Sequence, residues 1–226
     1  QHNLLKNIDE TDAALLAQSR MTKELQQELL RTRMVPLASI SERLYRIVRQ
    51  TSKELGKRAN LEIIGEQVEL DRSVLEKMTA PFEHLLRNAI DHGLEPQEQR
   101  RASGKQEAGT IELEARQEGN EILITLSDDG RGIDLAGIRA KALEQGLLTA
   151  DSEVTPAQLV ELIFAQGFST ATEITQVSGR GIGMDVVRNE IATLGGRVEA
   201  SSEQGKGTTF SIYLPLTLAV TQAVLV

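Results

Sequence analysis

Apolar residues recur at three- and four-residue spacing over long parts of the chain, and this period predicts α-helices. Proline or glycine punctuates them: Pro36 predicts a break after the first helix and Gly56 ends the second. Pro81 is expected to interrupt the third helix, which ends at Gly93. The expected helices cover residues 1–34, 38–55, 70–93, 135–145, 156–165 and 184–194.

Alternation of apolar and polar residues predicts strands between these helices. Gly119-Asn120 separates two of the strands in the manner of a hairpin, and residues 203–207 join the last two. Residues 94–108 are polar and rich in helix breakers, so we expect a surface connection there. The expected strands cover residues 61–64, 110–116, 121–126, 197–202 and 208–214. Helices beside hairpin strands favour an α+β fold, with one sheet and its helices on one face.

The first expected helix, residues 1–34, contains neither glycine nor proline. A helix of this length with an apolar stripe is not stable alone in water, because the stripe must be covered. We therefore expect this helix to associate with a second copy of itself or with a partner segment. The alternative is that it folds back on the domain that follows.

Composition narrows the classes of function. The chain has 226 residues and a formal net charge of -8, with four phenylalanines, two tyrosines, no tryptophan and no cysteine. An acidic, aromatic-poor chain is a poor candidate for nucleic-acid binding. Without cysteine there is no disulfide or thiolate chemistry, and the three histidines lack the partners of a zinc site. No apolar run is long enough to cross a bilayer, so we expect a cytoplasmic protein without a membrane span.

Residues 83–93, EHLLRNAIDHG, combine an apolar face with a polar one. Side chains three and four positions apart are neighbours on a helix. His84, Asn88 and either Asp91 or His92 should therefore point into one space. On its own this cluster is compatible with a metal site or with a general acid–base pair.

Three glycine-rich turns follow. Asp128 to Ile133 leaves a strand, where glycines permit close backbone approach to a ligand, although DDG is also an ordinary turn. Gly179 to Gly183 opens a helix, and a helix N-terminus attracts phosphate oxygens. It fits neither a Walker motif nor a dinucleotide fingerprint, since no Lys-Ser/Thr pair follows and no parallel crossover strand precedes it. Gly205 to Thr209, taken alone, is a hairpin loop.

In this order the four segments resemble the nucleotide site of the GHKL ATPases, which include histidine kinases, gyrase-type topoisomerases and mismatch-repair ATPases. The segments HLLRNAIDHG, DDGRGID, GFST, SGRGIGMDVV and LPLTLA resemble those of the CheA-type chemotaxis histidine kinases. Their particular wording hints at the CheA-type kinases of type IV pilus chemosensory systems. The resemblance implies a two-layer α/β sandwich of the GHKL (Bergerat) type, preceded by a dimerisation-type helix.

The resemblance also implies roles for single residues. Asn88 would coordinate Mg²⁺ at the phosphates of ATP, and Asp128 would accept a hydrogen bond from the adenine amino group. Arg87, His92 and Lys141 would be cations on the phosphate side, and residues 168–178 would form a lid. The implied catalytic residues are His84, Arg87 and Asn88. The implied nucleotide-binding residues are Asn88, Asp91, His92, Asp128, Gly130, Gly132, Ile133, Lys141, Phe168, Ser169, Thr170, Ser178, Gly179, Arg180, Gly181, Ile182, Gly183, Met184 and Thr208.

His84 stands where the hydrolysing GHKL enzymes have a glutamate that activates water. A histidine is less suited to generating hydroxide, which favours phosphoryl transfer to a protein over hydrolysis. The alternative is that His84 only packs. The function implied is an ATP-dependent protein-histidine kinase. The other hypotheses are a nucleotide-binding scaffold of a signalling array without catalysis and an ATP-driven clamp of the gyrase type.

The resemblance divides the chain into residues 1–34, part of a dimerisation hairpin, residues 35–215, the ATP-binding kinase domain, and residues 216–226, the start of an SH3-like regulatory domain. The implied partners are a histidine phosphotransfer domain, a response regulator, a coupling protein and a chemoreceptor array, with a homodimer in the full-length protein. The lid differs from the family pattern because GFSTATEITQVS contains no lysine. Neutralisation of the γ-phosphate is therefore less well provided for than in relatives.

Overall fold

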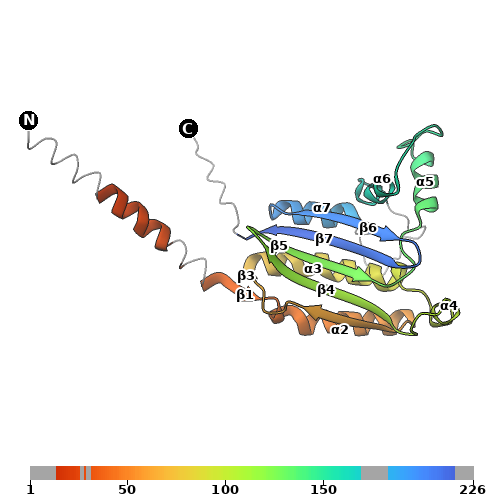
Figure 1. Cartoon of the computed structure of the whole chain (residues 1–226), viewed down its shortest axis with the longest axis horizontal. Coiled ribbons are helices and arrows are strands. Elements are labelled where there is room, and N and C mark those ends of the chain that lie inside the picture. Colours follow the sequence, from red (N-terminus) through yellow and green to blue (C-terminus); the bar gives the residue numbers. More distant parts are fainter. Residues whose placement is uncertain (1–13, 26–27, 29–31, 169–182, 217–226) are drawn as a thin grey trace, which may run out of the picture.

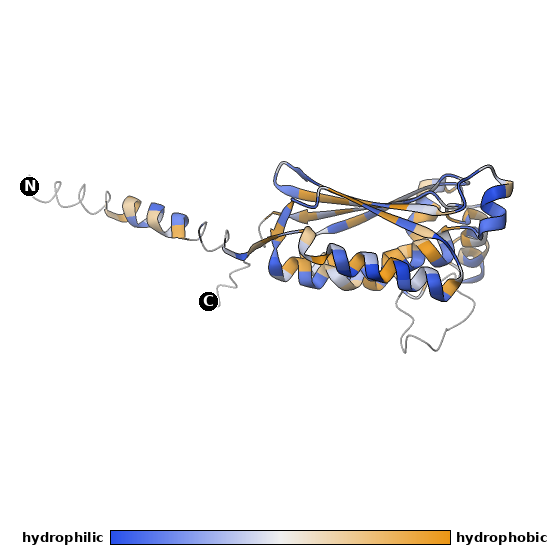
Figure 2. Cartoon of the chain, turned by 90° about the horizontal axis from the view of Figure 1, so that it is seen from below, coloured by the Kyte–Doolittle hydropathy of each residue, from blue (hydrophilic) through white to orange (hydrophobic). Residues whose placement is uncertain are grey.

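A computed structural model describes residues 14–25, 28, 32–168 and 183–216. Its main part is a two-layer structure, with one sheet and helices packed against one of its faces (Figures 1 and 2). The strands are β1 (Met34–Pro36), β2 (Ala59–Ile64), β3 (Glu69–Asp71), β4 (Gly109–Glu118), β5 (Glu121–Asp128), β6 (Arg197–Glu203) and β7 (Gly207–Pro215). The helices are α2 (Ala38–Leu55), α3 (Arg72–Asn88), η1 (Ala89–Gly93), α4 (Gln97–Ala102), α5 (Leu135–Glu144), α6 (Pro156–Glu161), η2 (Leu162–Phe164) and α7 (Met184–Thr193).

The main sheet has five strands in the order β2-β4-β5-β7-β6. β2 runs parallel to β4, and the other neighbouring pairs are antiparallel. Gly119, at φ 60°, forms the turn of the β4–β5 hairpin, in which Glu118 pairs with Glu121. The predicted hairpins and the α+β fold class are confirmed.

The core lies between this sheet and the helices α2, α3 and α7. Every second residue of β4 from Gly109 to Ala115 is buried, because alternate side chains of a strand point to the same face. The apolar face predicted for residues 83–93 meets this layer, and its members Leu85, Leu86 and Ile90 have no exposed surface. The polar side chains of the same stretch, among them Arg87, Asn88 and Asp91, stay outside this buried core.

The sequence led us to expect that Pro81 interrupts the third helix, and this prediction is wrong. α3 runs through it from Arg72 to Asn88, and the side chain of Asp71 caps the helix by accepting from the Ser73 amide. The helix tolerates proline because Pro81 is buried among the core residues, whose packing outweighs one missing backbone hydrogen bond. The last turn, expected as α-helix, is the π-helix η1.

Three short elements differ from the sequence prediction. Residues 34–36 and 69–71, expected at helix boundaries, form the antiparallel pair β1 and β3. Residues 94–108, expected as a surface connection, contain α4, and its Arg100 is buried. A charged residue in a sequence suggests a surface position, whereas Arg100 is buried because Glu95, Gln106 and Asp129 accept its hydrogen bonds.

Residues 14–25 are helical, and the apolar side chains of Leu15, Leu16, Met21 and Leu25 are exposed. Figure 1 shows this segment projecting from the two-layer part. The proposed division at residues 34 and 215 stays a prediction. Within the described ranges, no helix is both long and apolar enough to span a membrane.

Candidate functional site

A cleft of about 370 Å³ lies at the end of the sheet where β5 stops. Its walls are formed by the end of α3 with η1, the turn after β5, helix α5 and the start of α7. It brings together eight of the residues predicted from the sequence. These are Asn88, His92, Asp128, Gly132, Ile133, Lys141, Met184 and Thr208.

Asp128 is the last residue of β5, and its side chain is only 8% exposed. Its Oδ1 accepts a hydrogen bond from the Gly130 amide at 2.9 Å. Burial raises the pKa of Asp128 from 3.8 to about 6, against the opposing effect of backbone hydrogen bonds from Gly130 and Thr208. At neutral pH the group is therefore mainly a carboxylate, which is a strong hydrogen-bond acceptor.

Glycine is required where the turn after β5 approaches its neighbours. A Cβ at Gly130 would lie 2.1 Å from the carbonyl oxygen of Gly93. Gly132 has φ 78°, and a Cβ there would lie 2.6 Å from the carbonyl oxygen of Glu203. Larger residues would push the turn away from η1 and β6, so the two glycines set the shape of the cleft floor.

Asn88, the last residue of α3, also lines the cleft. Its Nδ2 lies 2.9 Å from Nε2 of His84 and 3.5 Å from the sulfur of Met184. Burial lowers the pKa of His84, and the nearby His92 and Arg87 lower it further. A neutral ring with its proton on Nδ1 can accept at Nε2 from the Asn88 amide. The amide nitrogen is then engaged, which leaves Oδ1 as the atom that can face a cation.

The remaining predicted residues lie elsewhere. Arg87 contacts Glu54 on the surface at 3.3 Å, and neither Arg87 nor Asp91 lines the cleft. Gly130 forms the turn behind the cleft, and Gly183 immediately precedes α7. Phe168 does not line the cleft, but the centre of its ring lies 5.9 Å from Nζ of Lys141, which does. Ser169, Thr170, Ser178, Gly179, Arg180, Gly181 and Ile182 fall outside the described residues.

Sequence reasoning missed other residues that line the cleft. They include Arg131, Asp134, Gly137, Ile138, Ile163 and Phe210. Arg131, Asp134 and Gly137 follow directly on the DDG turn, and that proximity could have marked them. Ile163 and Phe210 are apolar core residues by pattern, and only the folded arrangement shows that they reach the cleft.

The sequence of this chain matches a known family and several known proteins. Residues 77–218 match the family described as "Histidine kinase-, DNA gyrase B-, and HSP90-like ATPase". The chain is 47% identical over 223 residues to the chemotaxis protein CheA of Borreliella burgdorferi, covering 99% of this chain and 26% of that protein. It is 44% identical over 223 residues to the sensor histidine kinase CheAY of Helicobacter pylori, covering 98% of this chain and 28% of that protein.

Among solved structures, the catalytic domain of histidine kinase ThkA has a TM-score of 0.47 at 18% identity, covering 81% of this chain and 95% of that one. The chain spans about a quarter of the length of the CheA and CheAY proteins named above. The family match covers most of the two-layer part, including Asn88, Asp128 and the start of α7. The chain belongs to the family of histidine kinase-, DNA gyrase B- and HSP90-like ATPases.

Proposed function

We propose that this chain is the core of an ATP- and Mg²⁺-dependent protein-histidine kinase, which transfers the γ-phosphoryl group to a histidine on a separate domain. Family membership supports ATP as the nucleotide. The relatives named chemotaxis protein CheA and sensor histidine kinase CheAY support the kinase reaction.

The observation that carries the proposal is that Asn88 and Asp128 line the same cleft. A buried carboxylate accepts hydrogen bonds only, so it suits an exocyclic amino group such as that of adenine. An amide oxygen suits the hard cation that accompanies a triphosphate. The two residues thus assign the base to one end of the cleft and the phosphates to the other.

The phosphate end needs positive charge, because a triphosphate brings about four negative charges. Lys141 and Arg131 line the cleft and supply two cations, and His92 adds a hydrogen-bond donor. Of the phosphate-side cations predicted from the sequence, Lys141 and His92 line the cleft and Arg87 does not, whereas Arg131 is an additional one.

Mg²⁺ would be bound by the Oδ1 atom of Asn88 together with phosphate oxygens and water, and it would offset phosphate charge during transfer. Within the described ranges, no group of three or more histidine, aspartate or glutamate side chains could hold a metal ion. His84 and Met184 would orient the Asn88 amide toward the cation by engaging its nitrogen.

The transfer itself breaks the bond between the γ-phosphorus and the oxygen that bridges it to the β-phosphate. A bond forms to the unprotonated ring nitrogen of the acceptor histidine, ADP leaves, and the acceptor ring loses its other proton. The lowered pKa of His84 keeps its ring neutral near pH 7, and His84 would accept a proton only when Nε2 gives up its hydrogen bond with the Asn88 amide.

The setting we propose is a two-component chemosensory phosphorelay. The phosphoryl group would pass from the histidine phosphotransfer domain to a response regulator, and a coupling protein would connect the kinase to a chemoreceptor array. The protein would act in the cytoplasm as a homodimer. The relative named chemotaxis protein CheA supports the chemosensory setting, and the partners are those that the resemblance to CheA-type kinases implies.

The test is a transfer assay with radiolabelled ATP, Mg²⁺ and the histidine phosphotransfer domain of the same system. We expect label on that domain and none when Mg²⁺ is withheld. Asn88→Ala should abolish labelling, while a surface control, Lys77→Met, should label normally. Nucleotide binding without any labelling of the acceptor domain would contradict the kinase proposal.

A further inference from the structure

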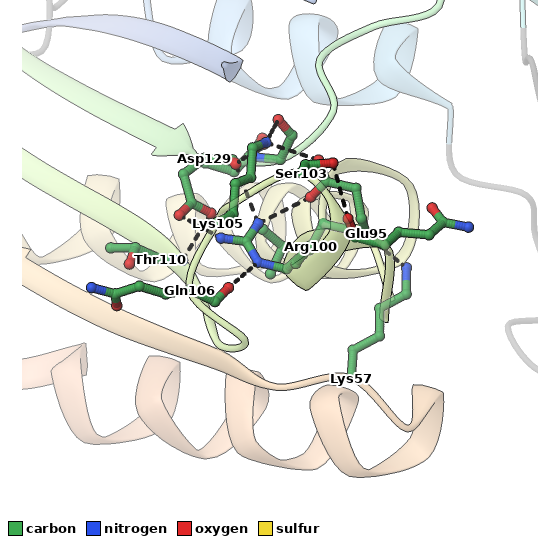
Figure 3. A network of polar contacts seen from close by, with 12 residues as sticks. Lys57, Glu95, Arg100, Ser103, Lys105, Gln106, Thr110 and Asp129 are labelled. Carbon is green, nitrogen blue, oxygen red and sulfur yellow. Dashed lines mark hydrogen bonds and ion pairs between the residues drawn. The ribbon is translucent and has the colours of Figure 1, made fainter. Parts of the chain in front are cut away.

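A buried group of charges lies behind the turn that follows β5 (Figure 3). Arg100 of α4 is 1% exposed and Lys105 is 21% exposed, and both contact Glu95 and Asp129. We call Arg100 and Lys105, with Glu95 between them, the cationic clamp. None of its three residues lines the cleft.

The two cations use their donors on a few acceptors. Arg100 donates from Nη1 to Glu95 at 3.0 Å and from Nη2 to the Asp129 carboxylate at 2.7 Å. Its Nε donates to the carbonyl oxygen of Gln106 at 2.7 Å. Lys105 donates to Glu95 at 2.8 Å and to the carbonyl oxygens of Asp129 at 2.8 Å and Gly130 at 2.7 Å. All three donors of the lysine ammonium are thereby engaged.

Such a network is a poor source of net stability. Removing charges from water costs several kcal/mol per ion, and a well-packed apolar cluster often stabilises as much. What it supplies is geometry, because charged donors fix the acceptors at defined positions. The acceptors fixed here are the backbone carbonyls of the DDG turn.

The same turn is fixed from other sides. The Asp129 carboxylate accepts from the Thr110 amide at 3.0 Å, which ties it to β4. The Arg131 amide donates to the carbonyl oxygen of Gly93 at 2.9 Å, which ties the turn to η1. Asp129 is thus occupied behind the turn, while the neighbouring Asp128 lines the cleft. The direction of the Asp128 carboxylate depends on the backbone that the clamp holds.

We propose that the cationic clamp sets base selectivity: Lys105 and Arg100 position the Asp128 carboxylate toward the exocyclic amino group of a 6-aminopurine nucleotide by holding the carbonyls of Asp129 and Gly130. Lys105 is a positioning residue and touches no ligand. The inference rests on the proposed function, since it requires a nucleotide in the cleft.

The test compares binding of ATP and of inosine triphosphate, which has an oxygen in place of the amino group. Calorimetry with Mg²⁺ gives both dissociation constants. The wild-type chain should prefer ATP by about tenfold or more, because one hydrogen bond to a charged acceptor is lost with inosine triphosphate. Lys105→Met should weaken ATP binding by about tenfold and change the binding of inosine triphosphate by less than about twofold. Lys105→Arg should restore the preference.

A merely structural role for Lys105 would weaken both nucleotides by the same factor, and an unchanged ratio would overturn the proposal. Lys77→Met, at an exposed position of α3, is the matched control and should leave both constants unchanged. If Lys105→Met does not fold, Lys105→Gln is measured by the same ratio. A wild-type chain that binds no ATP would overturn the proposed function, whereas ATP binding with an unchanged ratio would overturn the clamp alone.

Discussion

The Asp128 carboxylate carries a cost for the free protein. Burial raises its pKa in the folded chain from 3.8 to about 6. Between these values the folded state binds more protons than the unfolded state, so stability falls as the pH rises. The free energy of unfolding is therefore highest, as far as Asp128 is concerned, below about pH 4, and this advantage is lost above about pH 6. The loss is about 3 kcal/mol for a shift of this size.

Asp128→Asn should remove this pH dependence. Relative to the wild-type chain, we expect the variant to gain about 3 kcal/mol on going from about pH 4 to about pH 7. Urea denaturation at the two pH values measures the difference, and calorimetry on the same variant should show strongly weakened ATP binding. Parallel stability curves for the two proteins would show that Asp128 is not the group responsible.

A substitution at His84 separates proton transfer from positioning. Glutamine can still accept from the Asn88 amide, so His84→Gln should leave nucleotide binding largely intact. It should lower phosphoryl transfer by roughly 10²–10⁴, as expected for an acid–base group. Single-turnover transfer to the acceptor domain measures the rate. A fully active variant would assign His84 to packing alone.

At the scale of single residues, the sequence predicted those cleft residues that belong to a recognisable motif. Asn88 and Asp128 stand next to apolar residues in the sequence, and motif and pattern both marked them. Arg131 and Phe210 were not predicted as lining residues, because ordinary charged and core residues reach a cleft only through packing. Arg87 was expected near the phosphates, and in the folded chain a surface ion pair with Glu54 accounts for it.

At the scale of elements, the end of α3 depends on one lysine. Lys57, just beyond α2, donates from Nζ to the carbonyl oxygens of Ile90, Asp91 and Leu94. These carbonyls lie at or just after η1, where a helix leaves its last carbonyls unpaired. The ammonium therefore terminates the element that presents Asn88 and His92 to the cleft.

Lys57→Met should destabilise the chain by about 1–3 kcal/mol, because a partly buried set of carbonyls loses a charged donor. The methionine retains most of the apolar length of the side chain. Thermal or urea unfolding measures the effect, with Lys53→Met at an exposed position of α2 as the control. Equal stability of the two variants would mean that water replaces the ammonium without loss.

Elements with a long periodic pattern and a clear end were predictable. α2 ends at Gly56, which adopts φ 63° as expected for a helix-ending glycine. β1 and β3 were not predicted, since each has three residues and gains its hydrogen bonds from a segment distant in the sequence. α4 was missed because its sequence is polar, and its burial depends on the partners of Arg100.

For the molecule as a whole, residues 14–25 form a helix whose apolar side chains are exposed, apart from the two-layer core. Deleting residues 1–25 should leave the melting temperature and ATP affinity almost unchanged, because the described core begins at Leu37. It should also abolish self-association, which these side chains would mediate by covering one another.

Sedimentation of the full and shortened chains over a range of concentrations tests this association. We expect the full chain to form dimers and the shortened chain to remain monomeric. A monomeric full chain would favour a different partner for the helix. A large fall in melting temperature of the shortened chain would instead indicate that the helix packs on the core.

Asp128 ends β5 and lines the cleft, whereas the next residue, Asp129, contacts Arg100 behind the turn. A library of single substitutions should therefore separate the effects of the two residues. Asp129 neutralises the buried Arg100, so replacing it strands a charge and should reduce cellular abundance. Asp128 should tolerate a neutral isostere with no loss of abundance while binding fails. Selection for thermal stability alone would thus retain Asp129 and allow Asp128 to be replaced.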